Sequence, residues 1–167
     1  MTELYWITGP WAGRLAISAR PRAGDWLKDE MSEWQRAGVD TVVSLLTIDE
    51  ERELELEREA HVSRAAGMAF ISFPIVDRDV PSSRLDLVRL TDQLNAELAC
   101  GKNVVLHCRQ GIGRAGLVAA SLLMTAGAGL ENAISEVSDA RGLPVPETAE
   151  QRAWLAEFDT AAVHKSR

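Results

Sequence analysis

One ten-residue stretch, HCRQGIGRAG at positions 107–116, constrains the fold of this chain more than any other part of the sequence. A β-branched and apolar run at 104–106 precedes it, and a mostly apolar run at 117–123 follows it. The first run favours a buried strand, and the second, which has neither proline nor charge, favours a helix. The stretch therefore predicts a strand that ends at Cys108, a tight glycine-containing loop, and a helix that begins near Arg114.

The residue types in this loop are suited to binding and attacking a tetrahedral oxyanion. Cys108 becomes a nucleophile when it ionises, and a helix N-terminus with nearby cations stabilises a thiolate. Gly111 and Gly113 can adopt positive φ, which lets successive backbone N–H groups turn inward. Arg114 supplies a planar fork of donors for two oxygens. The alternative is an inert buried cysteine before an ordinary turn, which leaves Arg114 unexplained.

HCRQGIGRAG resembles the signature loop of the cysteine-dependent protein tyrosine and dual-specificity phosphatases, and most of all that of the kinase-associated and Cdc14-like branch. The resemblance implies hydrolysis of phosphotyrosine, and also of phosphoserine or phosphothreonine, on proteins through a phosphocysteine intermediate and without a metal or other cofactor. It assigns catalysis to Cys108 and Arg114. It assigns phosphate binding to the whole loop, Arg109, Gln110, Gly111, Ile112, Gly113 and Arg114.

The segment PIVDRDVPSS, at 74–83, offers two candidates for a general acid. Breaking a P–O bond requires a proton for the leaving oxygen, and a positioned carboxylic acid can supply it. In the resembled family the acid lies on a loop of this kind, and the Pro-Ile-x-Asp context favours Asp77 over Asp79. The alternative is a polar turn in which either aspartate only accepts hydrogen bonds from backbone N–H groups.

Three further positions carry expectations that come from the resemblance. His107 is expected to order the loop and tune the thiolate, although a buried histidine is often only a satisfied core side chain. Gln151 is expected to orient the water that hydrolyses the intermediate, but Thr148 and Gln151 also have the spacing of a capping box. Ala115 stands where the family usually has Ser or Thr, which predicts slow breakdown of the intermediate after a burst of leaving group.

Strands are predicted at 5–8, 15–18, 41–46, 68–73 and 103–107, and helices at 25–38, 47–66, 83–98, 114–126, 130–140 and 148–163. Strands separated by helices predict an α/β fold, with a mostly parallel sheet covered on both faces and a ligand site beyond the carboxyl ends of its strands. We expect Asp25 to cap the first helix. In the charge-dense segment 47–66 we expect a solvated acidic face with Leu54 as its buried anchor.

Composition limits the remaining function classes. The 167 residues contain no linker or repeat, which predicts one catalytic domain spanning 1–167. A net charge of −7 argues against a general nucleic-acid or membrane-surface binder. The resemblance implies that the partner is a phosphorylated protein or peptide, with phosphate, sulfate or vanadate as inhibitory oxyanions in the loop.

The sequence also gives an expectation about cellular location. No basic segment followed by an apolar core marks a signal peptide, and the apolar stretch at 115–130 is too short to span a bilayer. Cys100 and Cys108 flank a predicted strand and are not expected to form a disulfide. A free catalytic thiol fits a reducing cytoplasm.

Rival functions remain open at this point. A phosphoprotein-binding module with little turnover is favoured by Ala115. A phosphoinositide phosphatase could use the same loop, although Gln110 and Ile112 make this loop less basic than is usual for that class. Arsenate reduction would require a nearby resolving cysteine, for which Cys100 is badly placed, and sulfur transfer could also use such a loop.

Overall fold

The computed structural model describes residues 1–165, with side chains described as far as Phe158. Five strands form one sheet in the order β1-β2-β5-β3-β4. They are β1 (Tyr5–Ile7), β2 (Leu15–Ser18), β3 (Thr41–Ser44), β4 (Ala69–Ser72) and β5 (Val104–His107). Only β1 pairs antiparallel to its neighbour, and the other three pairings are parallel. The mostly parallel sheet predicted from the alternation of strands and helices is confirmed.

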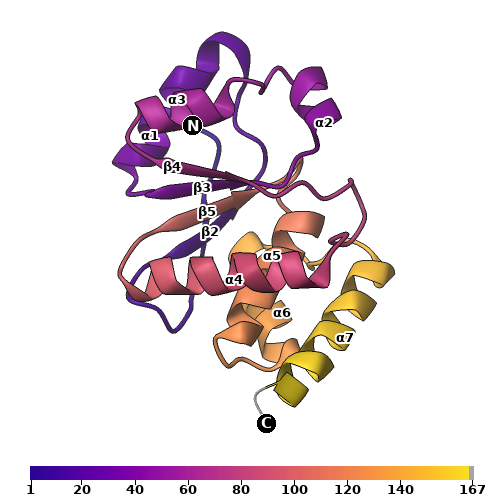
Figure 1. Cartoon of the computed structure of the whole chain (residues 1–167). Helices are drawn as coiled ribbons and strands as arrows, with labels where there is room; N and C mark the ends of the chain where they lie inside the picture. Colours follow the sequence, from indigo (N-terminus) through magenta and orange to yellow (C-terminus); the bar gives the residue numbers. More distant parts are fainter. Residues whose placement is uncertain (166–167) are drawn as a thin grey trace.

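Helices cover both faces of this sheet (Figure 1). They are a 3-10 turn η1 (Gly24–Trp26), α1 (Leu27–Arg36), α2 (Ile48–Glu53), α3 (Glu59–Ala65), α4 (Arg84–Ala99), α5 (Gly113–Thr125), α6 (Leu130–Arg141) and α7 (Ala149–Lys165). In Figure 1, α1, α2 and α3 lie above the sheet, and α4, α5, α6 and α7 lie below it. Within the described part of the chain, no helix combines the length and hydropathy that a membrane span needs.

Side chains alternate between the two faces of the sheet along each strand, so the sheet separates two apolar cores. In β5, Val104 and Leu106 belong to the core between the sheet and helices α4 and α5, whereas Val105 belongs to the core between the sheet and helices α1 and α3. In β2, Leu15 and Ile17 face the first core. Successive strand side chains point to opposite faces, so short apolar strands of this kind require helices on both sides.

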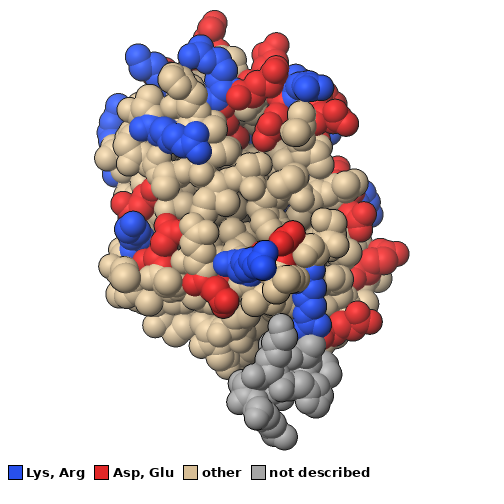
Figure 2. Space-filling model, in the orientation of Figure 1, with Lys and Arg blue, Asp and Glu red and all other residues tan. Residues whose placement is uncertain are grey.

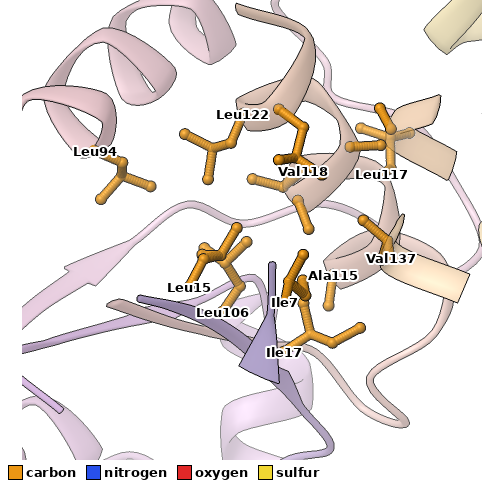
Figure 3. Close-up of a cluster of buried hydrophobic side chains, with 14 of the residues drawn as sticks. Ile7, Leu15, Ile17, Leu94, Leu106, Ala115, Leu117, Val118, Leu122 and Val137 are labelled. Carbon is orange, nitrogen blue, oxygen red and sulfur yellow. The ribbon is translucent and has the colours of Figure 1, made fainter. Parts of the chain in front are cut away.

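Helix α5 fixes the geometry of the carboxyl edge of the sheet. Every residue at 113–124 is buried, as expected for a helix that is apolar on all sides apart from Arg114 and Ser121. Figure 3 shows Ala115, Val118 and Leu122 of this helix directed toward the strand residues of the first core. This packing holds the N-terminus of α5 against the end of β5, where the signature loop lies.

Of two predicted side-chain caps, one marks the start of its helix and the other does not. The Ser83 side chain accepts a hydrogen bond from Asp86 N at 3.1 Å and begins α4, as predicted. The prediction that Asp25 caps the first helix is wrong, because Asp25 lies inside η1, which leads directly into α1 from Gly24 at φ +61°. No side chain caps α1.

The single helix predicted at 47–66 is two short helices, α2 and α3. Glu55, at φ +57°, lies in the connection between them. Leu56, 1% exposed, is the buried anchor in this segment, so the prediction of Leu54, which is only half-buried, is wrong. The turn between the helices moves the inward-facing position two residues along the chain.

Candidate active site

Cys108 lies directly after β5 and is 3% exposed. The backbone N–H of Gly111 donates a hydrogen bond to its Sγ at 3.3 Å. Gly111 has φ +71°, and a Cβ there would stand 2.5 Å from the carbonyl carbon of Ser18. A side chain at this position would therefore displace the amide that faces the sulfur.

The carbonyl side of the loop is held by a residue that sequence reasoning missed. Arg141, in the last turn of α6, donates from Nε to Gly111 O at 3.0 Å and from Nη2 to Gln110 O at 3.2 Å. Its guanidinium also stacks on the Tyr5 ring, 4.1 Å from the centroid. Arg141 therefore fixes the loop backbone at Gln110 and Gly111, next to the amide that donates to Cys108 Sγ.

Arg114 is 2% exposed at the start of α5, and its guanidinium is held by several acceptors. It donates to both carboxylate oxygens of Glu50, at 2.6 and 3.0 Å, and to Ile75 O at 2.8 Å. Burial acts to lower the pKa of Arg114, but its hydrogen bond to Glu50 and the neighbouring negative charges raise the pKa above the ordinary value. The guanidinium is therefore a fixed cation that is aimed before any substrate arrives.

The prediction that the charges of segment 47–66 form a solvated face is wrong for two of them. Glu50 and Glu59 are 8% and 1% exposed. Burial acts to raise the pKa of Glu50, but hydrogen bonds from Arg114 and from Thr47 N outweigh burial and hold the pKa below the ordinary value. Their partners on the signature loop explain why these carboxylates point inward.

His107 is fully buried and pairs with the second of these carboxylates. Its Nε2 lies 2.5 Å from Glu59 Oε2, and its Nδ1 lies 3.4 Å from Cys108 O. The second oxygen, Glu59 Oε1, is buried without a hydrogen-bond partner. These contacts connect the end of β5 to α3; the predicted effect of His107 on the thiolate stays a prediction.

The two candidate acids occupy different places. Asp77 Oδ1 accepts a hydrogen bond from Arg114 Nη2 at 3.0 Å, and Asp77 borders the same pocket as Cys108. Asp79 Oδ1 accepts from the N–H of Val80 at 2.7 Å and does not border that pocket. The geometry favours Asp77 as the residue close to the reacting groups.

Gln151 is fully buried, and its side chain is occupied by backbone groups. Its Oε1 accepts from the N–H groups of Glu147 and Thr148, and Thr148 Oγ1 accepts from Gln151 N, all at 3.1 Å. Its Nε2 donates to Asp79 O at 3.0 Å. The capping-box alternative is thus present, and Glu147, rather than Gln151, borders the pocket. The predicted water-orienting role of Gln151 stays a prediction.

The site is a small pocket of about 150 Å³. It is bordered by Asp77, Arg78, Cys108, Arg109, Gln110, Gly113, Arg114 and Glu147. Ile112 packs against the apolar core instead, and contributes to the loop through its backbone. A larger cavity of about 680 Å³ lies between α1 and α3 and shares no residue with the site. We assign the chemistry to the smaller pocket because the thiol, the guanidinium and a carboxylic acid converge only there among the described cavities.

Arg109 lies at the mouth of this pocket and is paired with carboxylates of α2. Its Nη2 lies 3.2 Å from Glu53 Oε1. Its Nε is 3.8 Å from Glu50 Oε2, an ion-pair distance without a hydrogen bond. Among the described side chains, no group of three or more His, Cys, Asp or Glu residues converges as metal ligands would.

Comparison with known proteins bears directly on this arrangement. Residues 17–128 match a family model described as a DSP-PTPase phosphatase of polymorphic toxin systems. Tk-PTP in its active form is 31% identical, with a TM-score of 0.75 over 89% of this chain and 92% of that one. No curated protein sequence gives a match.

More distant structures share the fold. Kinase associated phosphatase, with its catalytic-site cysteine replaced by serine, is 20% identical, with a TM-score of 0.85 over 97% of this chain and 96% of that one. PTPMT1 in complex with PI(5)P is 19% identical, with a TM-score of 0.76 over 97% and 99%. At these identities the comparison extends to architecture alone.

Proposed function

Because the chain belongs to the DSP-PTPase phosphatase family of polymorphic toxin systems, and is thus a cysteine-dependent phosphatase, we propose that it hydrolyses phosphate monoesters on protein side chains through a phosphocysteine intermediate. The observation that carries the proposal is the Gly111 N–H directed at Cys108 Sγ in a pocket that Arg114 and Asp77 also border. A nucleophile, anion donors and an acid are thereby available in one place.

In the first step the Cys108 thiolate attacks phosphorus, and the bond from phosphorus to the leaving oxygen breaks. Arg114 and the amides of residues 109–114 hold the three non-bridging oxygens. Asp77 gives its proton to the leaving oxygen. In the free enzyme this carboxylate is 3.0 Å from Arg114, and a phosphate group would replace it as the partner of the guanidinium.

In the second step water attacks the phosphocysteine, releasing phosphate and regenerating the thiolate. Gln151 supports this step in our proposal by fixing the turn that precedes α7, which it does through hydrogen bonds to the backbone of Glu147 and Thr148. Ala115, fully buried in the first turn of α5, offers no hydroxyl to the departing sulfur. We therefore expect this step to limit turnover.

The substrate that fits best is a phosphorylated tyrosine, serine or threonine side chain. The chemistry needs no metal, because Arg114 and the loop amides supply the positive potential. Cys100 and Cys108 are both free, and a catalytic thiol of this kind is suited to a reducing compartment such as the cytoplasm.

The test uses an aryl phosphate with a good leaving group and a tyrosine-phosphorylated peptide with a poor one. Cys108→Ser should abolish turnover and retain binding of vanadate or phosphate, and the wild type should show a burst of leaving group. Asp77→Asn should slow the peptide by about 10²- to 10⁴-fold and the aryl phosphate far less, whereas the matched Asp79→Asn should change neither.

The contrary outcomes are specific. Turnover that survives in Cys108→Ser removes this residue as the nucleophile. Equal losses on both substrates in Asp77→Asn transfer the acid role elsewhere. A wild-type protein that binds the phosphopeptide but releases no phosphate from either compound is a binding module, and the proposed activity is then wrong.

A further inference from the structure

The arginines at the mouth of the phosphate pocket are already engaged by carboxylates. Arg78 Nη1 lies 2.8 Å from Glu147 Oε1, and Arg109 Nη2 lies 3.2 Å from Glu53 Oε1. With the buried Arg114, these are the three arginines that border the pocket. None of the three carries its charge without a carboxylate partner within ion-pair distance.

Glu147 lies against the N-terminus of α5. A Cβ added to Gly113 would stand 3.0 Å from Glu147 Oε2, so this carboxylate lies against the first residue of α5. The helix N-terminus there attracts anions, and Glu147 competes for the same potential. The pairing joins two loops, because Arg78 follows Asp77 directly and Glu147 precedes α7.

The backbone of Arg78 supports the same interpretation. Its φ is +64°, a conformation that residues other than glycine adopt uncommonly. From this conformation its guanidinium reaches Glu147 across the pocket rather than pointing freely toward a substrate. The side chain is 62% exposed, so the pairing can be altered without opening the core.

The surroundings add negative rather than positive charge. Helix α2 carries four acidic residues, Asp49, Glu50, Glu51 and Glu53, and one arginine, Arg52. Two of its carboxylates pair with arginines of the pocket, Glu50 with Arg114 and Glu53 with Arg109. Figure 2 shows red atoms gathered in the region of α2, and blue and red atoms interspersed elsewhere on this face, without a continuous basic patch. A second phosphate near the first would therefore find every arginine that borders the pocket already paired with a carboxylate.

We propose that Glu147 is a specificity-determining residue: by occupying Arg78 it restricts the pocket to substrates with a single phosphate and rejects those with a second phosphate close to the first. The pocket volume of about 150 Å³ is below the range of about 300–1,000 Å³ that holds whole small ligands, which agrees with one bound group. The inference rests on the proposed phosphatase function. It selects singly phosphorylated protein side chains over doubly phosphorylated peptides and over inositol headgroups with adjacent phosphates.

The experiment compares kcat/KM for three substrates. They are a tyrosine-phosphorylated peptide, the same peptide with a second phosphate on a threonine two residues away, and a soluble short-chain phosphatidylinositol with phosphates on adjacent ring positions. The wild type should prefer the first substrate by about tenfold or more over each of the others. Because kcat/KM reports the steps up to formation of the phosphocysteine, later changes in its breakdown do not affect the comparison.

Variants then identify the cause. Glu147→Gln should shift the preference about tenfold toward the substrates with two phosphates. Glu150→Gln, one turn away on an exposed position, serves as the matched control and should leave the preference unchanged. In the double variant Arg78→Gln with Glu147→Gln the gain should disappear, because it depends on the freed guanidinium.

The proposal is overturned if the wild type hydrolyses the substrates with two phosphates as well as the first, or if Glu147→Gln leaves the preference unchanged. It is also overturned if the double variant keeps the full gain, since simple removal of negative charge would then suffice. A wild-type protein that hydrolyses none of the three refutes the proposed phosphatase function instead, so the two failures are distinguishable.

Discussion

Replacing Glu50 by glutamine tests whether the buried counter-charge of Arg114 is required for stability. Glu50 supplies two hydrogen bonds, at 2.6 and 3.0 Å, to a guanidinium that is 2% exposed. Glutamine keeps the shape and one acceptor oxygen but removes the negative charge. The remaining ionic partner is then Asp77, whose side chain is 48% exposed and which we propose as the general acid.

The expected loss of stability follows from the burial of the Arg114–Glu50 ion pair. Removing one partner of a buried ion pair costs about 3–5 kcal/mol, because the other charge is left uncompensated. Asp77 lies 3.0 Å from Arg114 and offsets part of this cost, so we expect the lower end, about 3 kcal/mol. For a domain of this size that loss corresponds to a decrease in Tm of about 6–12 °C.

The assay is thermal unfolding with Glu53→Gln as the matched control. Glu53 is on the same helix, but its side chain is 67% exposed, and its pairing with Arg109 is worth at most about 1 kcal/mol. We also expect kcat/KM of Glu50→Gln to fall by about 10- to 100-fold, because Arg114 loses its fixed orientation. A Tm within about 2 °C of the wild-type value would refute the reasoning, since Arg114 would then not depend on a buried carboxylate.

Two other predictions concern Gly111 of the signature loop and the stability of the protein at low pH. Gly111→Ala should lower the free energy of unfolding by at least about 2 kcal/mol and abolish turnover, because positive φ and contact with Ser18 both oppose a side chain. The control Gly67→Ala, at φ +92° in open space, should retain activity. An active Gly111→Ala enzyme would contradict the role of the Gly111 amide. Acid should destabilise the protein through Glu50 and Glu30, whose pKa values burial acts to raise but hydrogen bonds hold below the ordinary 4.5. Their contribution is fully present above pH 4.5 and is lost as pH falls through the lower pKa values of the folded state, so urea unfolding should show a steeper loss below this pH in wild type than in Glu50→Gln.

The parts of the site that are contiguous in sequence could be predicted, because their chemistry and geometry are local. Cys108, the loop glycines and Arg114 lie within one strand–loop–helix unit whose hydrophobic pattern is unambiguous. The choice between Asp77 and Asp79 needed the path of the chain, since two positions along a loop can face opposite sides.

The acidic supports could not be selected from sequence, because segment 47–66 contains many carboxylates with the same local character. Only the packing of α2 and α3 decides that Glu50 and Glu59 face inward. One signal was present: Thr47 and Glu50 have capping-box spacing, and the structure contains that box. Likewise, the sequence pattern favoured Gln151, which has capping-box spacing from Thr148, whereas Glu147 is the residue of that segment that borders the pocket.

The buried pairing of α2 and α3 with the signature loop has a consequence for protein engineering. Glu50 pairs with Arg114 and Glu59 contacts His107, yet both carboxylates come from outside the loop and from the opposite layer of the sheet. Transplanting the decapeptide onto another strand–helix unit would carry over the thiol and the guanidinium but leave Arg114 and His107 without their carboxylate partners. The smallest portable version of this catalyst therefore includes the two helices, and the two segments should change together when such enzymes diverge.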